Sequence, residues 1–263
     1  MHDTLTLKEI EYCRKLLEGV DSLKIQGIDS LKKKVLARLE QNNSENESLF
    51  ELRVAASIKS EAQNIKYEHP AISGSTVDFY CERDGHNYYI ELVSIRTSDA
   101  VKDATISSSP YKGIEMFETI LTSSNQDQRQ TTGGEIVKAQ EKIGEKVWDG
   151  QKCIKFNSPG VNDVNIIVVD MRGFNLGVMD HDDYKQICFS RTKHFPEEGF
   201  TGNKIIGLFD PRLNKKYAIK VREKLHFIVF TKNEAEPFSG CFVARNDVLV
   251  NDRSIPLPFE GVL

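Results

Sequence analysis

A short hairpin in the first half of the chain is the feature that most constrains its fold. Residues 75–95 read STVDFYCERDGHNYYIELVSI, two runs rich in β-branched and aromatic residues on either side of Asp84-Gly85. An Asp-Gly pair between two such runs is the strongest short-range signal for a two-residue hairpin turn. Each predicted strand also carries an acidic residue in apolar or aromatic company, Asp78 in the first and Glu91 in the second.

The two-residue turn sets the pairing of the strands, from Arg83 with His86 beside the turn to Asp78 with Glu91 farther out. Alternation along the ladder makes Asp78 and Glu91 a non-hydrogen-bonded pair, with side chains on one face and Cα atoms about 4.5 Å apart. Two carboxylates at about 4 Å repel each other by several kcal/mol at a protein-like dielectric. A shared proton, a cationic side chain or a bound divalent cation would offset that repulsion.

The face on which Glu91 lies is expected to be buried, because it also carries Tyr89, Val93 and Ile95. A half-buried pair of carboxylates is costly for stability, which favours a metal site. The alternative is a solvated, structurally neutral pair, and a bulge in the hairpin would separate the two groups. The residues alone leave both readings open.

Composition places the chain among water-soluble globular proteins. Of its 263 residues, 39% are hydrophobic and 28% are charged, and no apolar run approaches the roughly 20 residues that cross a bilayer. The N-terminus lacks the basic start and apolar stretch of a signal peptide. Five cysteines without a CxxC pair indicate free thiols in a reducing compartment. We therefore expect a cytoplasmic protein without a membrane partner.

The formal net charge of −4 argues against binding nucleic acid by bulk attraction, so any such contact needs a local basic patch.

Helical periodicity predicts a helical N-terminal appendage over residues 1–42, with two helices within 5–41. The polar segment 41–46 is the expected linker, and residues 43–263 form the expected core. A third helix, over 45–63, carries Glu51 on its apolar stripe.

Helices and buried strands alternate in the rest of the chain, which predicts an α/β layered core. Strands are expected at 65–68, 164–170, 204–210, 225–231 and 241–250, with helices at 134–147 and 182–188. Residues 96–132 are rich in Ser, Thr, Asp and Gln, which predicts a long loop with a short helix around 113–121.

The ordered set of acidic residues resembles the PD-(D/E)XK, or restriction-endonuclease-like, nuclease superfamily. That family has a helix with a Glu, a strand with an Asp, a hairpin, a strand with (D/E)-x-K, and a following helix with polar residues. Here Glu51 lies in FELRVA, Asp78 in TVDF and Glu91 in IELVS, and the helix GEIVKAQEKIGEK follows. The resemblance covers about residues 45–170 and implies an α/β/α core with a mixed central sheet.

One departure concerns the lysine, because Val93 stands where the family's (D/E)-x-K lysine would fall. In some members that lysine has moved to the following helix, where this chain has Lys138, Lys142 and Lys146 at four-residue spacing. Lys142 is favoured because it lies mid-helix beside the apolar line Ile136, Ala139, Ile143 and Val147. The alternative is an ordinary solvated helix face.

The resemblance implies an endonuclease that hydrolyses DNA phosphodiester bonds with Mg²⁺, for which Mn²⁺ substitutes, in restriction or another prokaryotic defence role. It assigns Asp78, Glu91 and the Leu92 carbonyl to the metal, Glu51 as a further ligand, and Lys142 to the attacking water. A homodimer is one arrangement that suits cleavage of both strands.

Two other classes remain open from the sequence. One is a catalytically degenerate relative that binds nucleic acid or serves in assembly, which Val93 favours. The other is an α/β enzyme of different chemistry that uses the two carboxylates as acid and base.

Overall fold

The computed structural model describes most of the chain: residues 7–41, 47–99, 105–111, 114–119, 132–172, 181–190, 205–233, 235–251 and 254–262. Its centre is a six-stranded mixed sheet in the order β1-β2-β3-β6-β7-β8. The strands are β1 (Gln63–Pro70), β2 (Thr76–Arg83), β3 (His86–Ser94), β6 (Asp163–Asp170), β7 (Phe227–Thr231) and β8 (Phe242–Arg245). Strands β1, β2 and β3 pair antiparallel, β3, β6 and β7 pair parallel, and β8 is antiparallel to β7.

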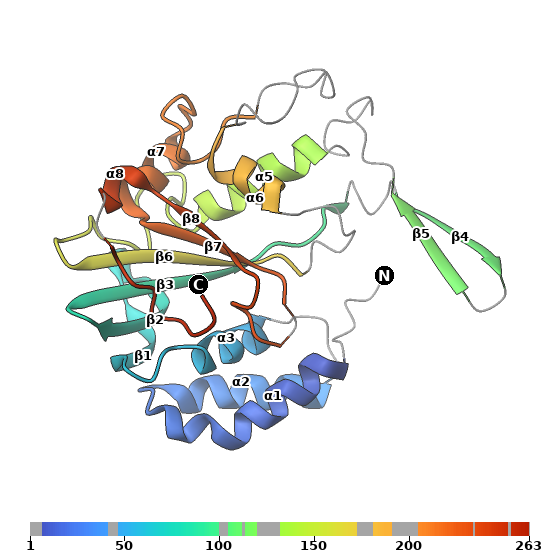
Figure 1. Cartoon of the computed structure of the whole chain (residues 1–263), viewed down its shortest axis with the longest axis horizontal. Coiled ribbons are helices and arrows are strands. Elements are labelled where there is room, and N and C mark those ends of the chain that lie inside the picture. Colours follow the sequence, from blue (N-terminus) through green and yellow to red (C-terminus); the bar gives the residue numbers. More distant parts are fainter. Residues whose placement is uncertain are drawn as a thin grey trace.

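Helices cover both faces of this sheet, so the protein has three layers (Figure 1). One face packs against α1 (Leu7–Gly19), α2 (Ile28–Gln41) and α3 (Glu47–Ala56). The other face packs against α5 (Thr132–Glu145), α6 (His181–Cys188) and α7 (Lys216–Lys224). The short helix α8 (Asp247–Val250) follows β8. The expected α/β class, with a mixed central sheet, is confirmed.

The two N-terminal helices share the core of the sheet. Cys13, Leu31 and Val35 are fully buried in the same apolar cluster as Phe79 and Ile90 of the sheet. The segment between α1 and α2 also joins β1, because Gln26 N donates to Ile65 O and Tyr67 N donates to Gln26 O. The helical segment expected over residues 1–42 is therefore bonded to the sheet, and Lys34 of α2 lies close to β1.

The strands expected at 164–170 and 225–231 are confirmed as β6 and β7. Two other expectations are wrong. Residues 114–119, within the expected helix 113–121, form β5, which pairs with β4 (Thr105–Tyr111) in a separate two-stranded sheet. The described part of 204–210 is not a strand. There Leu208 N donates to Ile187 O, and a Cβ on Gly207 would lie 2.3 Å from Phe189 N, so this segment packs against the end of α6.

The remaining differences are smaller. Only residues 242–245 of the expected strand 241–250 are extended, and α8 follows because the Asn246 side chain accepts from Val248 N and caps it. Helix α7, with its many lysines, was not expected. Among the described residues, no helix combines the length and the apolar character that a membrane span requires.

A buried ion network ties α1 to α3 and to the end of β6. Glu9 Oε1 lies 3.3 Å from Arg53 Nε and 2.5 Å from Arg172 Nη1, and Arg172 also pairs with Asp170 at 2.6 Å. Arg53 is fully buried, and its Nη1 donates to the Asn233 carbonyl. The network holds two cations and two anions, so its formal charges balance.

We expect Glu9→Gln to lower the free energy of unfolding by about 3–5 kcal/mol, because it leaves the buried Arg53 without its carboxylate. Urea denaturation measures this change. Glu18→Gln, at an exposed position of the same helix, is the control. Equal stability of the two variants would contradict a structural role for the network.

Candidate active site

The two carboxylates of the hairpin lie where β2 and β3 part. The expected register is confirmed from Arg83↔His86 to Phe79↔Ile90, and the regular ladder ends there. The expected next pair, Asp78 with Glu91, is not part of the ladder. Instead, Leu92 N donates to Asp78 Oδ2 at 2.6 Å. The Asp78 side chain therefore takes the place that the Val77 carbonyl would have in a continuous ladder, and its carboxylate lies in the gap between the strands.

The Glu91 carboxylate is buried and has two lysines at one of its oxygens. Lys146 Nζ lies 2.9 Å from Glu91 Oε1, and Lys155 Nζ lies 3.1 Å from the same atom. Glu91 Oε2 is also buried, but it has no hydrogen-bond partner among the described residues. One oxygen of this buried carboxylate is thus engaged by two lysines, and the other has no partner among the described residues.

Asp78 differs from an ordinary surface aspartate in its protonation. Burial, followed by repulsion from Glu91, raises the pKa of the Asp78 carboxyl to about 8, although its hydrogen bond from Leu92 N favours the ionised form. At neutral pH most of the Asp78 carboxyl is therefore protonated in the metal-free protein. A cation close to Asp78 would favour the ionised form.

Glu51 approaches Asp78 from α3. Its Oε2 accepts a hydrogen bond of 2.5 Å from Tyr67 Oη on β1, and Lys34 Nζ donates to the same hydroxyl at 2.8 Å. Burial raises the pKa of Glu51, and the charge of Glu51 in turn raises the pKa of Asp78. The three acidic residues singled out from the sequence are therefore neighbours, although they come from a helix and two strands.

The structure distinguishes the three lysines of the following helix. Lys146 contacts Glu91, whereas Lys142 pairs with Glu145 on the exposed face and Lys138 donates to the Arg96 carbonyl. The sequence expectation favoured Lys142 because it lies mid-helix. The carboxylates instead lie beside the last turn of α5, which ends at Glu145, so the residue that follows the helix reaches them.

Lys155 belongs to this site and was not expected from the sequence. It lies in the connection between α5 and β6, where no periodic pattern predicts the direction of a side chain. Its backbone has a left-handed φ of 66°, and its N–H donates to Ser75 Oγ at 3.1 Å. Its ammonium also donates to the Thr76 carbonyl at 2.6 Å, at the start of β2.

A second backbone irregularity lies directly beside Asp78. Glu68 of β1 has a φ of 52° and stands between the pairs Tyr67↔Phe79 and His69↔Val77, opposite Asp78. Left-handed conformations of residues other than glycine cost of order 1–3 kcal/mol and cluster at functional sites. The sheet is thus locally distorted where the carboxylates meet.

The donor atoms fit a hard divalent cation. Asp78 and Glu91 offer carboxylate oxygens, and the buried Glu91 Oε2 has no hydrogen-bond partner among the described residues. In an extended strand the N–H and C=O of one residue point to the same side, so the Leu92 carbonyl points toward Asp78, as its N–H does. Among the described residues, however, no group of three or more His, Cys, Asp or Glu side chains is placed to hold a metal.

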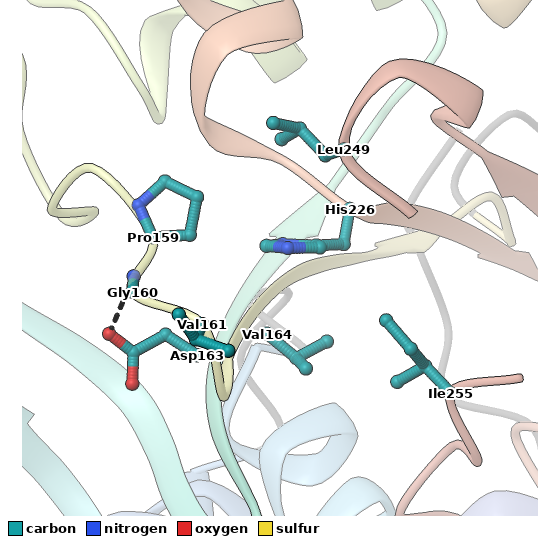
Figure 2. A pocket seen from close by; sticks show the side chains of 8 residues that line it. All are labelled: Pro159, Gly160, Val161, Asp163, Val164, His226, Leu249 and Ile255. Carbon is teal, nitrogen blue, oxygen red and sulfur yellow. Dashed lines mark hydrogen bonds between the residues drawn. The ribbon is translucent and has the colours of Figure 1, made fainter. Parts of the chain in front are cut away.

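A cavity of about 230 Å³ lies elsewhere, at the N-terminal ends of β6 and β7 (Figure 2). Its lining is mostly apolar, and Figure 2 shows the Asp163 carboxylate bonded to the Gly160 N–H. The same carboxylate accepts from Asn87 Nδ2, and His226 Nδ1 accepts from Asn165 N. Asp163 lies four residues before the position that pairs with Glu91, about 13 Å along the sheet, so the cavity is separate from the acidic cluster.

Comparison with known proteins assigns no family. No protein-family model matches the chain, and neither a curated protein nor a solved structure matches it.

Proposed function

We propose that this protein is a Mg²⁺-dependent DNA endonuclease with a restriction-endonuclease-like core. The observation that carries the proposal is the convergence of Asp78, Glu91 and Lys146 at the gap between β2 and β3. Two carboxylates and a lysine around an open oxygen position are the groups that metal-assisted phosphodiester hydrolysis requires.

The arrangement of the elements supports the same proposal. The chain order α3-β1-β2-β3, followed after the separate β4-β5 pair by α5 and β6, places Glu51 on α3, the carboxylates on a hairpin, and the lysine just after α5. In the sheet, β1, β2 and β3 are antiparallel and β6 is parallel to β3. These positions follow the pattern on which the sequence resemblance is based.

Asp78, Glu91 and the Leu92 carbonyl would hold Mg²⁺ or Mn²⁺. The bound ion would supply a Lewis acid for the scissile phosphate and lower the pKa of a coordinated water. Glu51, which accepts a hydrogen bond from Tyr67 and whose charge acts on Asp78, would serve as a further ligand directly or through a water.

Lys146 would act as a hydrogen-bond donor. Burial lowers the pKa of its ammonium, but the neighbouring Glu91 carboxylate outweighs that effect and raises the pKa above its usual value. The lysine therefore remains charged at neutral pH. In this state it would orient the attacking water or hold a phosphate oxygen, and it would not remove a proton.

Supercoiled plasmid DNA provides the first test. We expect the protein to nick or linearise it with Mg²⁺ or Mn²⁺ and to stop when EDTA is added. Glu91→Gln, purified in parallel, should lower the rate by at least about a hundredfold, because it removes a charge from the metal-binding oxygens. Glu82→Gln is the matched control, since Glu82 is a partly exposed carboxylate near the turn end of β2 and accepts hydrogen bonds from Tyr80 and Asn64.

Cleavage by Glu91→Gln at the wild-type rate would contradict the proposal and point to a contaminating nuclease. A wild-type protein that binds DNA but does not cut it would favour the catalytically degenerate module. That alternative has its own support, because the two lysines already provide Glu91 with counter-ions and Val93 replaces the expected lysine.

A further inference from the structure

The second lysine on Glu91 has no role in the function proposed so far. Lys146 already provides a counter-ion for this carboxylate at 2.9 Å. Lys155 adds a second ammonium at the same oxygen, so the group in direct contact holds two positive charges and one negative charge. A partly buried surplus cation is costly unless an anion binds beside it.

Burial also places the surplus charge at the boundary of the site. The Glu91 side chain is 1% exposed, whereas those of Lys155 and Lys146 are 21% and 35% exposed. The two ammonium groups therefore lie between the buried carboxylate and the solvent. An anion that arrives from solution reaches them before it reaches Glu91.

The backbone around Lys155 holds the residue in this position at a cost. Its φ of 66° is unfavourable for a lysine, and the conformation is retained by hydrogen bonds to Ser75 Oγ and to the Thr76 carbonyl. Both partners lie at the start of β2, just before Asp78. The ammonium is thus fixed relative to the two carboxylates, as a group that positions a substrate must be.

We infer that Lys155 is a phosphate-binding residue of this site, which pairs with Glu91 in the free protein and with a backbone phosphate of DNA in the complex. The inference rests on the proposed function for the identity of the anion. Glu91 and the phosphate compete for the same ammonium, so neutralising Glu91 strengthens DNA binding.

Because Glu91 and the phosphate compete for Lys155, we expect the effects of substituting Glu91 and Lys155 on DNA affinity to be coupled in the absence of metal. In EDTA, Glu91→Gln should bind a short fluorescent DNA duplex about tenfold more tightly than wild type, because two ammonium groups lose their carboxylate. Adding Lys155→Gln should remove most of that gain and reduce the salt dependence by about one phosphate contact. Adding Lys155→Arg, which keeps the positive charge, should retain most of the gain in DNA affinity. Fluorescence anisotropy at several salt concentrations measures all four proteins.

Lys152→Gln in the Glu91→Gln background is the matched control, because Lys152 is an exposed lysine in the same connection. It should leave the affinity unchanged. Urea denaturation of each variant identifies a change that is due to unfolding, and the Lys155→Arg protein keeps the test valid if Lys155→Gln is unstable.

The result that overturns the inference is a Glu91→Gln/Lys155→Gln protein that binds DNA as tightly, and with the same salt dependence, as Glu91→Gln. Cleavage of plasmid by wild type in Mg²⁺ distinguishes this failure from failure of the proposed function. Cleavage without coupling removes the role of Lys155 and leaves the nuclease. Coupling without cleavage establishes a phosphate site and contradicts the nuclease.

Discussion

Asp78→Asn should abolish Mg²⁺-dependent DNA cleavage and, at the same time, stabilise the metal-free protein. In the proposed function the substitution removes a charged oxygen that would bind the metal, for which we expect a loss of rate of about a thousandfold. It keeps an oxygen that accepts the hydrogen bond from Leu92 N, so the end of the hairpin is preserved. The gain in stability follows from the raised pKa of the Asp78 carboxyl.

The sign of the pH dependence follows from proton linkage. The pKa of Asp78 is about 8 in the folded protein and 3.8 in its reference state, so the folded state holds a proton that the unfolded state releases between these values. The contribution of Asp78 to the free energy of unfolding of wild type therefore decreases as the pH rises through this window, by up to about 1.4 kcal/mol per pH unit, and levels off above it. Asp78→Asn lacks this contribution, so its advantage over wild type should grow from pH 4 to pH 8.

Urea denaturation in EDTA across this range measures the difference between the two proteins. Asp29→Asn, at an exposed carboxylate of α2, controls for the general pH dependence of the fold. Added Mg²⁺ should stabilise wild type and leave Asp78→Asn unchanged, because a ligand that binds the folded state raises its stability. If Asp78→Asn is less stable than wild type at pH 8, ionisation of Asp78 does not destabilise the folded protein. That result would contradict the raised pKa of the Asp78 carboxyl.

Lys146→Ala should lower the rate of plasmid cleavage by about 10²- to 10³-fold, the range expected when one hydrogen-bond donor that stabilises charge in the transition state is removed. Lys142→Ala should leave the rate unchanged. The two lysines lie one turn apart, but Lys146 contacts Glu91 and Lys142 pairs only with the exposed Glu145 among the described residues. Comparing the two variants therefore separates the effect of a lysine's position in the site from the effect of losing one positive charge.

The dependence on substrate separates catalysis from binding. Lys146→Ala should reduce kcat with little change in KM, whereas loss of a group that only binds DNA would raise KM. A Lys142→Ala variant that loses as much activity as Lys146→Ala would show that the lysines act through the general electrostatic field and not through the contact with Glu91.

The hairpin shows how far local sequence information extends. Its register followed from the Asp84-Gly85 turn, because a two-residue turn leaves one pairing for the residues next to it. The buried parallel strand β6 was identified equally well from its continuous apolar run. The strand pair β4 and β5 was missed, since the Ser-rich β4 sequence TISSSPY carries little hydrophobic periodicity and the apolar positions of the β5 sequence IEMFET do not alternate strictly.

The sequence by itself therefore determined the α/β class and the hairpin that carries Asp78 and Glu91, because turn chemistry and apolar periodicity act between residues that are near neighbours in the chain. Only the tertiary structure decided which cations meet them. Lys146 replaced Lys142 because the carboxylates lie beside the end of α5, and Lys155 joined them because a strained loop is held against the start of β2. Both contacts cross long stretches of sequence, and no local pattern encodes the direction in which a lysine on a loop or a helix end will point.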